Sequence, residues 1–306
     1  MRMRSRGEVN GFGFICRQIK PHGFSIHESY AHVMTTSRVP RIAALLSYIF
    51  MIVMNTVSTT LPLNGVTPDE VSDKYDTLFA PIGFTFSIWG IIFLLLGVYS
   101  VYQLFRDNEW IRDITPWFTA SNLLNATWIF TWHYEVIWAS LIIISTLLVV
   151  LIRITATTSS ARTRWEHGFS ASLPFNIYLG WITVATVANA SALFVQQGFQ
   201  GGVIFDAQGW AIAILFVAAI IGITTAHVRR ALSYGLVLVW AYWGILSRHL
   251  SPEEWNGEYP GVILTVQILL PILAIAAIVA FIRYLRQPRA EIPTTWLWSM
   301  KVAASK

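Results

Sequence analysis

Long apolar stretches alternate with short polar segments along most of this chain. Each stretch is long enough to cross about 30 Å of hydrocarbon as a helix that rises 1.5 Å per residue. Their interiors carry no charged residue before the last few positions. The pattern predicts eight membrane-spanning helices, near 42–60, 84–105, 117–133, 136–155, 172–194, 209–226, 231–247 and 262–282.

The basic residues fall on alternate connecting segments. Of the 21 Lys and Arg residues, all except Lys74 and Arg248 lie before the first span, after the second, fourth or sixth span, or after the last. Because segments rich in Lys and Arg stay in the cytoplasm, this asymmetry predicts eight crossings with both termini cytoplasmic. The expected fold class is therefore an all-α polytopic bundle in a lipid bilayer, with the cell (plasma) membrane as the expected location.

Residues 1–41 are polar, Arg-rich and without a sustained period, so we expect a cytoplasmic N-terminal tail. An Arg-rich, acid-poor N-terminus can also be an organellar transit peptide. Met34 would make a plausible alternative start, which leaves open whether residues 1–33 are translated. Residues 286–306 are interpreted as a cytoplasmic C-terminal tail.

Composition narrows the classes of function. The chain is 55% hydrophobic and only 12% charged, against roughly 25% charged residues in soluble domains. Cytoplasmic arginines beside anionic headgroups account for the net charge of +5, so no nucleic-acid partner is expected. Cys16 is the single cysteine and the seven histidines are scattered, which excludes a disulfide framework and leaves no recognisable metal site.

The longest segment predicted on the external side, 61–81, is acidic. Within it, Thr67-Pro68-Asp69-Glu70 is typical of a capping box at a helix start, so a short helix should lie over the external mouth of the bundle. The run Ser251-Pro252-Glu253-Glu254 repeats that pattern in the last external segment.

Three spans carry aromatic, small and amide residues at helical spacing, so that each set shares one helix face. Amides are costly in hydrocarbon unless paired, which places Asn125 and Asn189 in the bundle interior. Such faces either enclose a flat apolar ligand or are packing seams joined by small and amide residues. The three sets are Trp89, Phe93, Gly97 and Ser100; Asn122, Asn125, Trp128 and Trp132; and Tyr178, Trp181, Ala185, Asn189 and Ala192.

The same sets resemble motifs of the TspO/MBR family, the tryptophan-rich sensory or translocator proteins. APIGFTFSIWGIIFLLLG at 80–97 is similar to the family's second helix, with Pro81, Trp89 and Gly97 on motif positions and Phe93 in place of a Tyr. LLNATW at 123–128 and YLGWITVATVAN at 178–189 are similar to motifs of the third and fifth helices. Gly83 stands where the family has a Trp, and Ile177 where it has a Pro, so the pocket wall near Gly83 departs from the pattern.

The resemblance covers about 42–195 and implies a five-helix TspO-like bundle there. Residues 196–285 would then add three further membrane helices. The resemblance also implies a sensory or regulatory protein that binds a flat hydrophobic molecule, such as a porphyrin or another tetrapyrrole, with no firm cofactor. The candidate ligand-binding residues are Trp89, Phe93, Asn125, Trp128, Trp132, Tyr178, Trp181, Ala185 and Asn189.

Two other classes of function are open at this point. Whether the chain forms a homodimer is open as well. A transporter or exporter of a small apolar solute is compatible with eight spans, although no ionisable residue lies near midspan to act as a relay. An enzyme would rest on His133, Tyr134 and Glu135, which follow one another at the end of the third span and could perform acid–base chemistry. A polar turn between two helices explains these three residues equally well.

Overall fold

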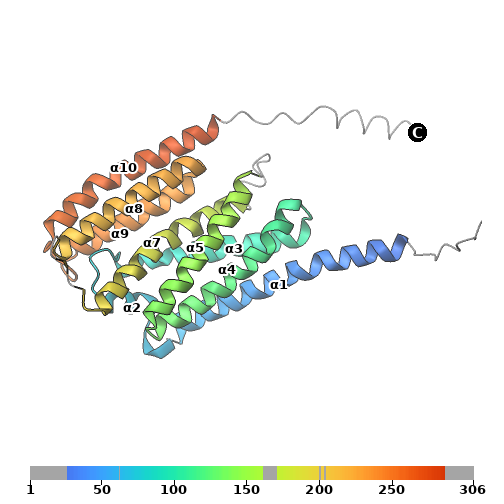
Figure 1. The fold of residues 1–306 in the computed structure, drawn as a ribbon, viewed down its shortest axis with the longest axis horizontal. Helices are drawn as coiled ribbons and strands as arrows, with labels where there is room; N and C mark the ends of the chain where they lie inside the picture. The colour runs from blue at the N-terminus through green and yellow to red at the C-terminus, as the bar shows by residue number, and fades with distance from the viewer. Residues whose placement is uncertain (1–25, 62, 161–170, 200, 203–204, 287–306) are drawn as a thin grey trace, which may run out of the picture. The chain divides into compact units, whose positions relative to one another are not determined.

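The computed structural model describes residues 26–61, 63–160, 171–199, 201–202 and 205–286. Regular elements in this part of the chain are all helical, as predicted, and Figure 1 labels the longer ones. Residues 1–25 and 287–306, most of both predicted tails, lie outside the described residues. The elements are α1 Ile26–Thr60, η1 Leu63–Gly65, α2 Pro68–Lys74, η2 Gly83–Ser87, α3 Ile88–Phe105, α4 Glu109–His133, α5 Ile137–Ser160, α7 Leu173–Gln196, α8 Ala207–Arg229, α9 Leu232–Leu250 and α10 Pro260–Leu285.

Two helices begin earlier than the apolar pattern predicts. Helix α1 starts at Ile26 and continues through Pro40, so residues 26–41 are helical although their sequence shows no sustained apolar period. Helix α4 starts at Glu109, before the predicted span at 117–133. The apolar pattern misses its first turns because they are amphipathic. Apolar runs mark the hydrocarbon-facing part of a helix, and they miss polar turns that extend it.

Six of the described helices are long and apolar enough to cross a membrane: those at 38–60, 83–105, 137–159, 173–196, 207–229 and 260–285. Helices α4 and α9 fall short in hydropathy because they carry amide, Trp, Tyr, Arg and His side chains. Their 25 and 19 residues still correspond to about 37 and 28 Å of helix. The chain is thus a polytopic membrane bundle, and the eight crossings stay a prediction.

The helices from residue 37 onward pack as one unit. Helix α5 lies between α4 and α7, α7 also packs on α9, and α10 lies against α9 and α8 (Figure 1). Small residues allow close approaches: a Cβ on Gly180 of α7 would lie 3.0 Å from Val237 Cβ of α9, and one on Gly235 would lie 2.7 Å from Ala277 Cβ of α10. The last three helices are therefore joined to the preceding ones by close backbone packing.

The segments that connect helices at the end where α2 lies, hereafter the α2 end, are joined by hydrogen bonds. Asn64 Nδ2 donates to His133 O at 3.0 Å, and His249 Nε2 donates to Leu78 O at 2.9 Å. At the opposite end, Arg41 of α1 pairs with Asp107 at 2.6 Å, between α3 and α4. Polar contacts thus fix both ends of the bundle.

Candidate functional site

Trp89 of α3 lies at the centre of an aromatic cluster. Its ring stacks on Phe93 at a centroid distance of 5.3 Å and approaches Trp128 of α4 to 5.8 Å. From α7, Tyr178 and Trp181 meet Trp89 edge-on at 6.0 and 6.3 Å. Stacked and edge-to-face arrangements are the favourable ones for aromatic quadrupoles. The faces of three helices therefore meet in one cluster.

A chain of buried hydrogen bonds holds part of this cluster in place. Asn55 Nδ2 of α1 donates to Asn125 Oδ1 at 2.8 Å, and Asn125 Nδ2 donates to the Tyr178 hydroxyl at 3.0 Å. All three side chains are buried. Since an unpaired amide in an apolar interior is costly, this chain explains why Asn125 faces inward. It also fixes the Tyr178 ring against Trp89.

A small cavity of about 30 Å³ adjoins the cluster, enough for about one water molecule. Side chains from α2, η2, α3, α4 and α7 contribute to its wall. The lining residues are Ser72, Pro81, Phe86, Trp89, Trp128, Trp132, Trp181, Val184, Ala185, Ala188 and Asn189.

Three polar atoms of these lining residues have no hydrogen-bond partner among the described residues: Trp128 Nε1, Trp181 Nε1 and Asn189 Oδ1. Two other polar groups of the lining are paired: Trp132 Nε1 donates to Pro68 O at 3.0 Å, and Asn189 Nδ2 donates to Ser140 Oγ at 2.8 Å. Buried polar groups are normally hydrogen-bonded. Two donors and one acceptor are therefore left for a molecule among these aromatic walls.

The structure brings the nine predicted ligand-binding residues together. Six of them line the cavity, and three lie behind its wall. Trp89, Trp128, Trp132, Trp181, Ala185 and Asn189 line the cavity. The other three support its wall: Phe93 stacks on Trp89, and Asn125 holds Tyr178.

Sequence reasoning missed five lining residues. Phe86 precedes Trp89 by three positions, and Val184 and Ala188 follow Trp181 at three and seven positions, so helical spacing could have indicated all three. Ser72 and Pro81 lie outside the long helices, where no periodicity applies. Gly83, which replaces a family Trp, faces α2: a Cβ there would lie 3.1 Å from Asp69 Oδ2.

Helix α2 covers the cavity and has the predicted start. The Glu70 carboxylate accepts from the Thr67 N–H at 2.7 Å, and this contact lowers the pKa of Glu70. Lys74 pairs with Glu135, beyond the end of α4, at 2.6 Å, and this hydrogen bond lowers the pKa of Glu135. The capping box over the bundle is thus confirmed as a helix start, and α2 is tied to α4.

A second tie joins α2 to the last three helices. Arg248, at the end of α9, is only 2% exposed and lies 3.1 Å from Asp73 of α2 and 3.1 Å from Glu254. Burial raises the pKa of Asp73, although Arg248 acts in the opposite direction. Residues 252–257 form turns, so the expected helix start at Ser251-Pro252 is wrong, because Glu254 pairs with Arg248 instead.

The three residues of the enzyme interpretation have separate partners. His133 is buried with Nδ1 2.7 Å from Ile129 O, Tyr134 packs on Phe130, and Glu135 pairs with Lys74. Within the described residues no group of three or more His, Cys, Asp or Glu could hold a metal ion. These contacts are typical of a structural turn.

Comparison with known protein families gives a match over most of the chain. Residues 41–300 match the family model described as TSPO-like protein. The matched range includes α8, α9 and α10 as well as the helices that carry the motifs. No curated protein and no solved structure matches the chain at a significant level.

Proposed function

Because this membrane protein belongs to the TSPO-like protein family, we propose that it binds a flat hydrophobic ligand in the aromatic cavity and has a sensory or regulatory role. The observation that carries the proposal is the wall of four Trp side chains in which two indole N–H groups and one amide oxygen have no partner among the described residues. Flat rings stack on such walls, and the polar atoms orient them.

The cavity is too small for a macrocycle, because its volume is only about 30 Å³. Binding therefore requires the walls to open. Helix α2 is the element best suited to move, because it contributes Ser72 to the wall and is short. Its ties to Glu135 and Arg248 would then oppose opening.

The charges at the α2 end favour an uncharged ligand. Carboxylates of a porphyrin would need Lys or Arg, but Lys74 pairs with Glu135, and Arg248 pairs with Asp73 and Glu254. A ligand carboxylate would have to displace one of these partners. We therefore propose a neutral flat molecule, and a tetrapyrrole as an ester rather than as a free acid.

Loss of one aromatic wall should weaken binding of such a ligand. Base–aromatic stacking is worth roughly 1–3 kcal/mol per ring, so Trp181→Ala should raise the dissociation constant of a porphyrin dimethyl ester by about one to two decades. Quenching of tryptophan fluorescence measures it. Trp138→Ala is the matched control, because Trp138 lies on α5 and is 61% exposed.

A second variant separates the cavity from general packing. Ala185→Phe adds bulk to the cavity wall and should prevent binding while the thermal midpoint stays near that of the wild type. Equal weakening by the two Trp substitutions, or no binding of either ester or free acid by the wild type, would show that the aromatic faces are packing seams.

We propose an orientation with both termini in the cytoplasm and the α2 end outside the cell membrane, from the distribution of Lys and Arg. In a Cys16→Ser background, Glu70→Cys and Gln197→Cys should react with a membrane-impermeant thiol reagent applied to intact cells. Glu109→Cys and Arg286→Cys, exposed at the opposite end, should react only after lysis. The reverse result would invert the orientation.

A further inference from the structure

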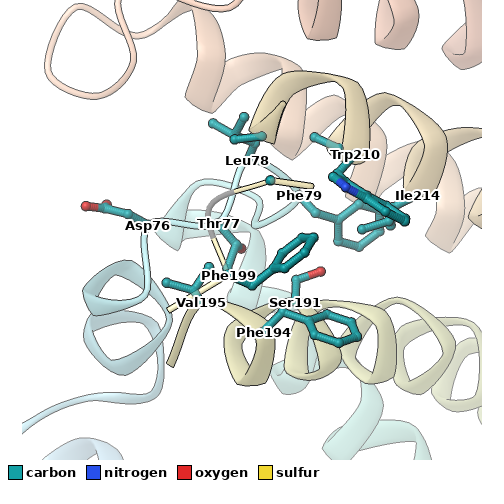
Figure 2. A pocket seen from close by; sticks show the side chains of 13 residues that line it. Asp76, Thr77, Leu78, Phe79, Ser191, Phe194, Val195, Phe199, Trp210 and Ile214 are labelled. Atoms are coloured by element: carbon teal, nitrogen blue, oxygen red, sulfur yellow. The ribbon is translucent and has the colours of Figure 1, made fainter. Parts of the chain in front are cut away.

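A second, larger cleft lies at the α2 end, between α7 and α8. Its volume is about 330 Å³, some ten times that of the aromatic cavity. Three segments line it: the chain between α2 and η2, the last turns of α7 with the residues that follow, and the first turns of α8 (Figure 2). The lining is almost entirely carbon, and its large apolar side chains include Phe79, Phe194, Phe199, Trp210 and Ile214.

Three rings of this cleft, those of Phe194, Phe199 and Trp210, are exposed, whereas Phe79 is buried. Phe194 contacts Phe199 at a centroid distance of 5.8 Å, and Phe199 contacts Trp210 edge-on at 5.7 Å. The exposed fraction is 56% for Phe194 and 38% for Trp210. Figure 2 shows Phe194 and Phe199 on one side and Trp210 and Ile214 on the other. Phe194 and Trp210 belong to helices that are long and apolar enough to cross a membrane, so we expect these exposed rings to face the apolar part of the bilayer.

The cleft continues into the lipid-facing surface of α8. Trp210, Ile214, Val217 and Ile221 recur at three- and four-residue spacing and so follow one helix face from the cleft toward midspan. Val217 and Ile221 are exposed large apolar residues. A molecule in the surrounding hydrocarbon therefore has a continuous apolar path into the cleft.

The charges around the cleft are acidic. None of its lining residues is Lys or Arg. Asp76 lies at its edge and is exposed, and Asp206, next to lining residue Ala207, caps α8 by accepting from the Gly209 N–H at 2.7 Å. An anionic headgroup or a fatty-acid carboxylate would be repelled here, whereas an ammonium group would be attracted.

We propose that this cleft binds the hydrocarbon chain of a zwitterionic phospholipid from the leaflet at the α2 end, with the ammonium group toward Asp76 and Asp206. The inference is independent of the ligand proposed for the aromatic cavity. Lipid tails are as apolar as the lining, so binding gains no free energy from the hydrophobic effect. The gain comes from dispersion contacts, because an empty cleft leaves the carbon atoms of its lining without neighbours.

Labelling with a photoactivatable lipid tests the proposal. The full chain is reconstituted in phosphatidylcholine nanodiscs that contain phosphatidylcholine with a diazirine near the end of one acyl chain. After irradiation, peptide mapping should place labels on 194–199 and 207–214. Ala211→Phe, which fills the cleft, should lower labelling of these peptides by about tenfold, the equivalent of roughly ten lost carbon contacts.

Val217→Phe is the matched control, because it adds the same ring to the same helix on the lipid-facing surface. Ala207→Phe also lines the cleft but is exposed, so it decides the result if Ala211→Phe fails to fold. Equal labelling of wild type, Ala211→Phe and Ala207→Phe would overturn the proposal. Stronger labelling of these peptides by a diazirine fatty acid or by phosphatidylglycerol than by phosphatidylcholine would overturn the assigned headgroup.

Discussion

Replacing Asp73 and Glu254 together by Ala is expected to lower the free energy of unfolding by about 3 kcal/mol or more, because it leaves a buried guanidinium without a counter-charge. Arg248 is 2% exposed and lies 3.1 Å from each carboxylate. Arg248→Met removes the buried charge instead. It should cost less, about 2 kcal/mol, because the side chains of Asp73 and Glu254 are 41% and 28% exposed and can be hydrated when their partner is lost.

Equilibrium unfolding in mixed micelles measures both effects. Lys74→Met is the matched control: Lys74 also ties α2 to the bundle, but its side chain is 60% exposed, so its loss should cost at most about 1 kcal/mol. If Lys74→Met proves as damaging as the double Ala variant, burial of Arg248 is not the source of the stability.

Asn125→Leu is the second substitution for which we expect a large effect, a loss of about 2–3 kcal/mol. The Tyr178 hydroxyl would lose its donor and one Asn55 hydrogen bond would be lost, while a branched apolar side chain would enter a filled interior. Individual hydrogen bonds between membrane helices average about 0.6 kcal/mol, so most of the loss should come from the unpaired groups and the altered packing.

Two comparisons separate these contributions in the same unfolding experiment. Tyr178→Phe leaves the packing in place and unpairs only Asn125 Nδ2, so it should cost less than Asn125→Leu. Asn122→Leu, on the same helix, breaks a single hydrogen bond to Ser47 and should also cost less than Asn125→Leu. A larger loss for Asn122→Leu than for Asn125→Leu would contradict a special role for the Asn55–Asn125–Tyr178 chain.

The sequence predicted the features that depend on helical periodicity. Trp89, Trp128 and Trp181 were assigned to inward faces of three helices because period 3.6 and apolar composition are local properties, and the structure brings these faces together. The same reasoning missed the start of α1, since the turns at 26–41 are helical but not apolar.

Features made by contacts between distant segments could not be predicted in this way. Ser72 reaches the aromatic cavity because α2 folds back over it, and Glu254 pairs with Arg248 rather than starting a helix. The small volume of the cavity depends on contacts between rings of three helices, which no spacing encodes. Similarly, the cleft needs Phe79, Phe194 and Trp210 from three segments.

The buried Arg248 has a consequence for ligand affinity as well as for stability. If a ligand can enter only when α2 is displaced, the measured dissociation constant equals the intrinsic one divided by the fraction of molecules in which α2 is open. A tie worth about 2 kcal/mol lowers that fraction about thirtyfold. Arg248→Met should then bind a neutral flat ligand more tightly while unfolding more easily. The last three helices, through one guanidinium, would set the concentration range in which the protein responds.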